Sequence, residues 1–502
     1  MPNPLYDALL SPHLGQETPF LTLTDGGPVS HDRFLKLSAQ ISHALVAEGA
    51  KTGDRVAVQV AKSPEALAIY AACIQAGLIF LPLNTAYTPA EVDYFVDNAE
   101  ARLLICDPSA ERALAPIAHR VGAKTLTLAS DGAGSLLALA ADQPQVFDTV
   151  DRVETDLAAF LYTSGTTGRS KGAMLSQGNL LSNAQTLVDY WRFTQEDILL
   201  HALPIFHTHG LFVASNIQLL TGGQMIFLSR FDTDEVIRWM PKATTMMGVP
   251  TFYTRLLADP RFTGDLTAHM RLFISGSAPL LAETHHQFEE RTGHRILERY
   301  GMTETNMNTS NPYEGDRRAG TVGHPLPGVE IKITDPSTGA IMPDGETGQI
   351  EVRGPNVFQG YWRMPEKTRE ELRDDGFFIT GDVGVIGPDG YVQIVGRGKD
   401  LIISGGFNIY PKEIEQILDT QDGVSESAVI GVHHPDFGES PIGILVAEGA
   451  GPDVSDIDTK LRDQLARFKQ PKMLIVVDEL PRNTMGKVQK NILRERYKDA
   501  FQ

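Results

Sequence analysis

Residues 161–172 read Leu-Tyr-Thr-Ser-Gly-Thr-Thr-Gly-Arg-Ser-Lys-Gly, and they follow an apolar run at 157–161. The apolar run is typical of a buried strand. The loop after it offers backbone N–H groups, hydroxyls and a lysine, which together can hold phosphate oxygens, and its glycines allow a close backbone approach. A Walker A loop would end in Gly-Lys-Ser/Thr, which is missing here, so composition alone leaves a flexible turn as the alternative.

Strand-like and helix-like segments alternate on both sides of this loop. Short apolar runs predict buried strands at 55–60, 103–106, 224–228 and 272–275. Residues 63–77 predict a helix, because Ser63 can cap it, Pro64 suits its first turn and Gly77 suits its end. This alternation predicts α/β layers from about residue 30 to about residue 310.

The second part of the chain has a different pattern. Between 329 and 395, short alternating strands are separated by Asp-Gly and Gly-Pro turns, which predicts a small antiparallel β unit. The segment after it mixes helices with strands such as 428–432, and a chain of 502 residues is too long for one hydrophobic core. The glycine-flanked turn 396–400 is therefore the predicted boundary between an N-terminal domain, 1–398, and an α+β C-terminal domain, 399–502.

Charge and composition exclude several classes of protein. The net charge of −19 argues against general binding to nucleic acid or to anionic membranes. Cys73 and Cys106 are the only cysteines, too few for a disulfide framework or a four-sulfur metal site. The N-terminus does not read as a signal peptide, and no run approaches eighteen apolar residues. We therefore expect a cytoplasmic protein, either a monomer or a homodimer.

Six motifs in order resemble those of the adenylate-forming superfamily of acyl-CoA synthetases, luciferases and adenylation domains. The loop at 161–172 resembles the phosphate loop of that family. The other five are at 276–279 (Gly-Ser-Ala-Pro), 300–305 (Tyr-Gly-Met-Thr-Glu-Thr), 380–382 (Thr-Gly-Asp), 396–400 with 404–408, and 481–487 (Pro-Arg-Asn-Thr-Met-Gly-Lys). Together they span nearly the whole chain.

The resemblance implies a ligase that uses ATP and Mg²⁺ to join an acid first to AMP and then to coenzyme A. Glu304, with Thr166, would hold Mg²⁺, a cation that prefers oxygen ligands. Lys487 would bridge the α-phosphate and the acid, Lys399 would be the hinge of a mobile C-terminal domain, and Gly405 and Gly406 would face coenzyme A. The implied nucleotide ligands are Thr163, Ser164, Gly165, Thr166, Thr167, Gly168, Lys171, Gly276, Ser277, Ala278, Tyr300, Gly301, Met302, Thr303, Asp382 and Arg397.

The acid site is assigned from three further stretches. Residues 205–210 match the family's substrate-side histidine motif, which puts His207 near the reacting carboxyl group, with Ser277 beside it. Arg255 falls on the segment that lines the acyl pocket in relatives and could pair with a second carboxylate, or it could lie on a helix surface. Arg299 and Arg169 could bind phosphate or Mg-ATP, and Arg299 could instead hold the distal carboxylate.

Three longer strings, 201–216, 247–255 and 298–311, closely resemble bacterial malonyl-CoA synthetases. This resemblance implies malonate as the leading acid and methylmalonate as a second one, with no nucleic acid or membrane partner. The alternatives are a ligase for another short acid such as acetate, a freestanding adenylation enzyme that loads a carrier protein, and an inactive nucleotide-binding protein. Acylation of Lys487 would remove its charge and silence adenylation, which is a hypothesis about regulation.

Overall fold

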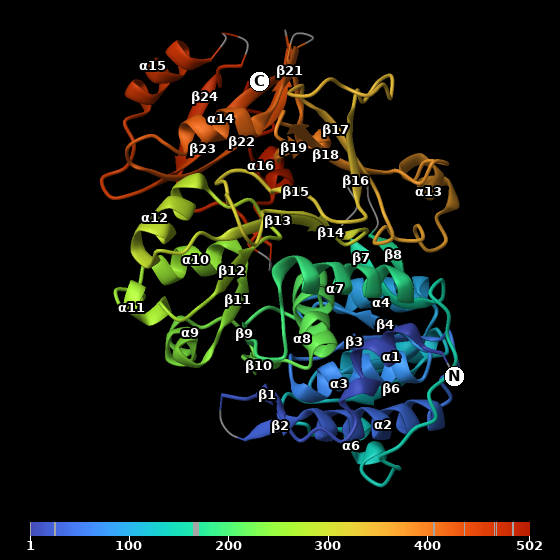
Figure 1. Cartoon of the computed structure of the whole chain (residues 1–502). Helices are drawn as coiled ribbons and strands as arrows, with labels where there is room; N and C mark the ends of the chain where they lie inside the picture. Colours follow the sequence, from blue (N-terminus) through green and yellow to red (C-terminus); the bar gives the residue numbers. More distant parts are fainter. Residues whose placement is uncertain are drawn as a thin grey trace. The chain divides into compact units, whose positions relative to one another are not determined.

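A computed structural model describes residues 2–24, 27–163, 170–404, 407–435, 437–465, 467, 469–483 and 486–501 (Figure 1). The chain separates into two compact units, one of residues 1–330 with 353–378 and one of residues 331–352 with 379–502. Each unit is described by itself. The boundary between the two domains that the sequence predicts at 398/399 stays a prediction.

The first unit contains two sheets that confirm the predicted α/β layers. The six-stranded sheet has the order β6 (Lys124–Thr127), β5 (Ala101–Cys106), β3 (Arg55–Gln59), β4 (Ile79–Pro82), β7 (Leu157–Thr163), β8 (Lys171–Ser176). The nine-stranded sheet has the order β15 (His324–Pro325), β14 (Asn306–Ser310), β13 (Leu297–Met302), β12 (Leu272–Ser275), β11 (Thr245–Gly248), β9 (Ile198–His201), β10 (Gln224–Phe227), β1 (Pro19–Thr22), β2 (Pro28–Ser30). Strands β13, β12, β11, β9, β10 and β1 run parallel to their neighbours in that order.

Helices of the first unit connect and cover these strands. They are α1 (Pro4–Leu9), α2 (His31–Ala47), α3 (Pro64–Gln75), α4 (Pro89–Asn98), α5 (Glu111–Arg120), α6 (Ser135–Ala140), α7 (Gln177–Trp191), α8 (Asn216–Thr221), α9 (Thr233–Trp239), α10 (Pro250–Leu257), α11 (Gly264–Thr267), α12 (Ala282–Thr292) and α13 (Pro365–Glu371). Short 3₁₀ turns lie at η1 (Ser11–His13) and η3 (Met240–Lys242), and η2 (His209–Ser215) is a π-helix. Figure 1 shows α1, α7 and α8 close together, and α1 contacts both of the others.

Helix α3 begins and ends where the sequence predicts. The Ser63 hydroxyl accepts a hydrogen bond from the Ala66 N–H at 3.1 Å, and Pro64 occupies the first turn. Gly77 follows the helix with φ +67°, a conformation that costs glycine little. All ten residues from Ala66 to Gln75 are buried, so the capped ends fix a helix that packs on every side.

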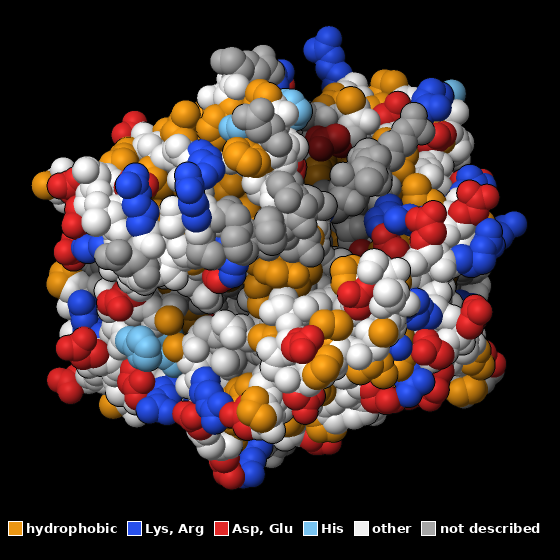
Figure 2. All heavy atoms as spheres, turned by 90° about the horizontal axis from the view of Figure 1, so that it is seen from above, with side chains coloured by type: hydrophobic (Ala, Val, Ile, Leu, Met, Phe, Trp, Pro, Cys, Tyr) orange, Lys and Arg blue, Asp and Glu red, His pale blue; other side chains and the backbone are white. Residues whose placement is uncertain are grey.

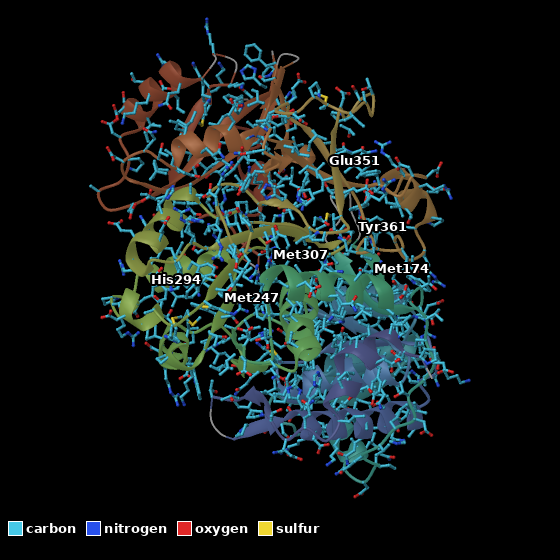
Figure 3. The ribbon with its side chains drawn as sticks, viewed as in Figure 1. Met174, Met247, His294, Met307, Glu351 and Tyr361 are labelled. Atoms are coloured by element: carbon cyan, nitrogen blue, oxygen red, sulfur yellow. The ribbon has the colours of Figure 1, made fainter. Side chains whose placement is uncertain are left out.

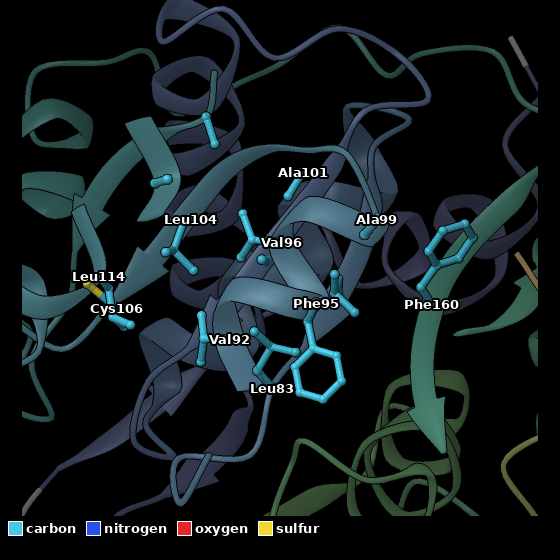
Figure 4. Packing of buried hydrophobic residues seen from close by; sticks show 14 of the residues in the cluster. Leu83, Val92, Phe95, Val96, Ala99, Ala101, Leu104, Cys106, Leu114 and Phe160 are labelled. Carbon is cyan, nitrogen blue, oxygen red and sulfur yellow. The ribbon is translucent and has the colours of Figure 1, made fainter. Parts of the chain in front are cut away.

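A large apolar cluster joins the six-stranded sheet to α4 (Figure 4). Val92, Phe95 and Val96 lie on one face of α4, and Leu104 and Cys106 alternate along β5 beneath them. Both cysteines are buried and free, and burial raises the pKa of Cys106 to about 12. These thiols serve as packing groups.

The second unit contains the predicted small β unit and a five-stranded sheet. The small sheet runs β16 (Glu330–Thr334), β17 (Gly348–Arg353), β18 (Phe378–Ile386), β19 (Val392–Arg397), and β18 and β19 are antiparallel. The larger sheet has the order β21 (Phe407–Ile409), β20 (Ile402–Ser404), β23 (Gly438–Ala447), β22 (Val424–His434), and β24 (Met473–Val477) pairs with β23. The other elements are the 3₁₀ turn η4 (Gly398–Asp400) and helices α14 (Pro411–Leu418), α15 (Val454–Gln464) and α16 (Lys490–Arg496).

The face drawn in Figure 2 carries charged side chains of both signs. Figure 2 shows Lys and Arg side chains interspersed with Asp and Glu side chains over the visible face, with apolar side chains between them. Among the described residues, no helix combines the length and the apolar character that crossing a membrane requires.

Candidate active site

The ends of four parallel strands bring the predicted acid-site residues together. Strands β9, β11, β12 and β13 are neighbours, so their carboxyl ends lie at one edge of the sheet, where α/β proteins commonly bind ligands. His207 follows β9, Ser277 follows β12 and Arg299 lies on β13. Figure 3 labels Met247 of β11 and Met307 of β14 in this part of the first unit.

Two histidines follow β9 in the chain: His207 is half-buried and His209 is buried. His207 precedes the π-helix η2 and His209 opens it, and π-helical turns are frequent at functional sites. Burial lowers the pKa of His207 to about 4, so the ring is neutral at pH 7. Among the described residues, the Nε2 atoms of His207 and His209 have no hydrogen-bond partner. A neutral imidazole with a free ring nitrogen can bind an oxygen of a substrate without adding charge.

Gly276 and Ser277 follow the end of β12, where they lie next to Arg299 and His209. Ser277 has φ +72°, an uncommon value for a residue other than glycine, and its hydroxyl lies 3.2 Å from Nδ1 of His209. A Cβ atom on Gly276 would come within 2.4 Å of Cζ of Arg299. A side chain at 276 would therefore displace the Arg299 guanidinium, which packs against the Gly276 backbone.

Arg299 is a buried cation with unused donors. The residue is 4% exposed, and its Nε and Nη2 atoms have no hydrogen-bond partner among the described residues. Burial lowers the pKa of Arg299 to about 9, which leaves it charged at neutral pH. Burying an unpaired charge is strongly unfavourable, so this arrangement indicates a site for an anion.

Arg255, which the sequence places either in the acid pocket or on a helix surface, belongs to α10. Arg255 is exposed on α10, whose buried face is formed by Phe252, Tyr253 and Leu256. Its guanidinium carbon lies 6.0 Å from the centre of the Phe231 ring. Arg255 thus lies on the surface of α10, one of the two positions that the sequence left open, and its part in binding the acid stays a prediction; Arg299, by contrast, is buried.

The glycine-rich loop lies between β7 and β8, as the sequence predicts. Thr163 and Lys171 pair across these two strands, which form a hairpin. The expected phosphate ligands Ser164, Gly165, Thr166, Thr167 and Gly168, with Arg169, lie outside the described residues. The Lys171 ammonium lies 3.1 Å from the carboxylate of Glu371 and 4.1 Å from the centre of the Tyr361 ring.

Tyr361 connects the predicted metal ligand to the lysine of the loop. Its hydroxyl lies 3.1 Å from Oε1 of Glu304 and 2.7 Å from Oε2 of Glu371, and a phenol has one proton to donate to these two carboxylates. In Figure 3, Tyr361 lies near Met174 of β8, consistent with the bridge between Ala173 and Tyr361. Sequence reasoning missed Tyr361 and Glu371, because Glu371 is separated from Lys171 by 200 positions.

Glu304 fits the role of a magnesium ligand. It is 4% exposed and lies in the turn between β13 and β14, beside the predicted nucleotide residues Tyr300, Gly301, Met302 and Thr303. Within the described ranges, no group of three or more His, Cys, Asp or Glu residues could hold a metal ion. A single protein carboxylate suits Mg²⁺ that is held mainly by the phosphates of a nucleotide and by water.

In the second unit, Asp382 and Arg397 form an ion pair. They face each other across β18 and β19, with Nε of Arg397 2.7 Å from Oδ1 of Asp382. Asp382 is 3% exposed, and its N–H donates to the Thr380 hydroxyl at 3.0 Å. Arg397 therefore orients the carboxylate that the resemblance assigns to the ribose.

Lys487 and the predicted hinge also lie in the second unit. The Lys487 N–H donates to Oδ1 of Asn483 at 2.9 Å, and Gly486 before it has φ +74°. Desolvation of its ammonium, and then the charge of Arg397, lower the pKa of Lys487 to about 8, although much of the residue is solvent exposed. Lys399 lies in η4, and the glycines assigned to coenzyme A, Gly405 and Gly406, lie outside the described residues.

Comparisons with known proteins cover the whole chain. Residues 15–362 match the AMP-binding enzyme family and residues 413–487 match the AMP-binding enzyme C-terminal domain. The chain is 34% identical over 481 residues to a malonate–CoA ligase of Arabidopsis thaliana, covering 89% of this chain and 78% of the relative. It is 35% identical over 504 residues to a feruloyl-CoA synthase of Amycolatopsis sp, covering 98% of each. The crystal structure of ATP-bound MatB from Rhodopseudomonas palustris matches all of both chains with a TM-score of 0.98 and 58% identity.

Proposed function

The chain belongs to the AMP-binding enzyme family, and on this premise we propose that it is a malonate–CoA ligase. It converts ATP, malonate and coenzyme A into malonyl-CoA, AMP and diphosphate through a malonyl-adenylate. The observation that carries the choice of acid is the buried guanidinium of Arg299, whose Nε and Nη2 atoms have no hydrogen-bond partner among the described residues. Relatives named for malonate and for ferulate match at similar identity, so the acid has to be argued from the site.

In the first step, a carboxylate oxygen of the acid attacks the α-phosphorus, the bond to the bridging oxygen breaks and diphosphate leaves. Negative charge grows on the phosphate oxygens, so the site must present cations and oriented donors to them. Lys171 and the glycine-rich loop would hold the β- and γ-phosphates, and Lys487 would neutralise the repulsion between acid and α-phosphate. Glu304 would hold Mg²⁺, which supplies further positive charge when bound.

In the second step, the sulfur of coenzyme A attacks the acyl carbon, the carbon–oxygen bond to AMP breaks and AMP leaves. Lys487 cannot remain between the reactants while a thiol enters, so the C-terminal domain would turn about Lys399 between the steps. Domain motion of this kind limits turnover in many enzymes.

Arg299 is proposed to bind the second carboxylate of malonate. A guanidinium offers paired N–H groups that match a carboxylate with two charge-assisted hydrogen bonds. A monocarboxylic acid of the same size would leave that buried charge unpaired, which costs about 2–5 kcal/mol. The rings of His207 and His209 are neutral, so they do not add positive charge to the site. The charge that favours the malonate dianion is therefore assigned to Arg299.

A pyrophosphate-release assay over a panel of acids, with and without coenzyme A, tests the proposal. Malonate should give the highest kcat/KM, with methylmalonate second and acetate, propionate and ferulate lower. Preference for a monocarboxylic acid would contradict the proposal. Adenylation that proceeds without any transfer to coenzyme A would indicate a carrier-loading enzyme, and no diphosphate from any acid would indicate an inactive nucleotide-binding protein.

Glu371 provides a prediction about nucleotide affinity. Glu371→Gln should lower KM for ATP about three- to tenfold, because it frees Lys171 for the phosphates and removes a negative charge that repels them. The matched control is Glu370→Gln on the same helix, since Glu370 is more exposed and pairs with Lys367. KM for ATP is measured at saturating acid, and a rise in KM for Glu371→Gln alone would show that Glu371 orders Lys171 for binding.

A further inference from the structure

Lys62 is a half-buried lysine that the proposed reaction does not use. It lies in the connection between β3 and α3, at the carboxyl end of a strand of the six-stranded sheet. Its Nζ atom lies 2.7 Å from Nδ1 of His201, 2.8 Å from the His201 carbonyl oxygen and 2.9 Å from the Leu203 carbonyl oxygen. None of the ion pairs formed by the described residues includes Lys62, so it binds uncharged acceptors instead of a carboxylate.

The hydrogen-bond pattern fixes the proton of His201. The Gly210 carbonyl oxygen can only accept a hydrogen bond, so Nε2 of His201, which lies 2.8 Å from it, must carry the proton. Nδ1 of His201 therefore accepts, and the single proton of its neutral ring lies on Nε2. This Nε2–H donates to the Gly210 carbonyl oxygen at 2.8 Å, which the Ser215 hydroxyl also reaches at 2.9 Å.

These contacts hold both ends of the loop that carries His207. Lys62 binds the Leu203 carbonyl before His207, and His201 binds the Gly210 carbonyl after it. The two ends are also close to each other, because a Cβ atom on Gly210 would lie 2.1 Å from the Pro204 carbonyl oxygen. Nε2 of His207 has no hydrogen-bond partner among the described residues, so its position depends on the backbone of this loop.

We propose that Lys62 is a positioning residue of the acid site, which acts through His201 and Leu203 to fix the loop that carries His207. The identity of the acid rests on the proposed function, whereas the fixing of the loop does not. Lys62 follows a strand of one sheet of the first unit and His201 ends a strand of the other, so the contact joins the two sheets at the start of the loop that carries His207. Displacement of a reacting group by about 1 Å can reduce a rate about 100-fold, so this support matters for catalysis.

The test compares Lys62→Met with Tyr70→Phe. Methionine keeps the length and apolar stem of Lys62 but donates no hydrogen bond. Tyr70→Phe removes another buried hydrogen bond, from the Tyr70 hydroxyl to Oδ1 of Asn216 at 3.2 Å, at the far end of η2. Two quantities are measured: the steady-state constants for malonate and ATP, and amide hydrogen exchange over residues 203–215.

For Lys62→Met, kcat/KM for malonate should fall about 10- to 100-fold while KM for ATP stays within about twofold, because the phosphate loop follows β7, which β4 separates from the strand that leads to Lys62. Exchange over residues 203–215 should accelerate in Lys62→Met and stay near that of the wild type in Tyr70→Phe. Lys62→Gln, which keeps two donors, should give an intermediate loss and serves as the test if the methionine variant fails to fold.

The outcomes separate this inference from the proposed substrate. Unchanged hydrogen exchange and unchanged kcat/KM for malonate in Lys62→Met would overturn the positioning role. An equal fall in kcat/KM for malonate in Tyr70→Phe would overturn it as well. Accelerated exchange in a protein whose wild type does not use malonate would leave the positioning role intact and refute the proposed acid.

Discussion

Arg299→Leu should reduce kcat/KM for malonate about 30- to 3000-fold and leave kcat/KM for propionate unchanged or higher. The buried guanidinium is the group proposed to meet the second carboxylate, and its Nε and Nη2 donors are unused by the described residues. Leucine removes the charge and fills much of the apolar volume. The monocarboxylic acid then no longer leaves a buried cation unpaired, so the preference between the two acids should narrow or reverse.

Arg255→Ala is the matched control for this prediction. Arg255 is exposed on α10, so its replacement should change kcat/KM for both acids less than about twofold. Steady-state kinetics with malonate and propionate on the two variants checks both expectations. Equal losses on the two acids in Arg299→Leu would show that Arg299 binds phosphate or Mg-ATP instead, which was the other role left open by the sequence.

The two arginines show where sequence reasoning was sufficient and where it was not. The apolar positions Phe252, Tyr253 and Leu256 occupy one side of α10, so helical periodicity alone would have placed Arg255 on the exposed side. The burial of Arg299 follows from its place on β13, inside the nine-stranded sheet, and from Gly276 on the neighbouring connection. The spacing of residues in the chain does not report such a contact between strands.

Contiguous motifs were predicted well, and contacts between distant segments were not. The strand before the phosphate loop, the cap of α3 and the small β unit are confirmed because local composition and turn residues determine them. By contrast, Lys62 and His201 are 139 positions apart, and they meet only because two sheets pack together. One sequence contains no record of that packing.

Lys487→Ala should reduce malonyl-adenylate formation about 100- to 1000-fold while a preformed malonyl-adenylate still reacts with coenzyme A at a rate within about threefold of the wild type. The ammonium is needed while two anions approach each other in the first step, whereas in the second step a thiol attacks an acyl carbon whose carboxylate charge was removed by the bond to AMP. Diphosphate release measures the first half-reaction, and thioester formation from added adenylate measures the second. The assignment would be contradicted if Lys487→Ala retained both half-reactions or lost both of them.

The pH dependence gives an independent check on the same group. Desolvation lowers the pKa of Lys487 to about 8, so the ammonium is present below that pH and is lost as the pH rises through it. The rate of adenylate formation should therefore fall above about pH 8, and the rate of thioester formation from added adenylate should not share that decline. Arg397 lies close enough to depress the same pKa, so Arg397→Gln should move the decline to higher pH. An adenylation rate that stays level up to pH 10 would show that Lys487 does not act through its charge, because no other property of the side chain changes over that range.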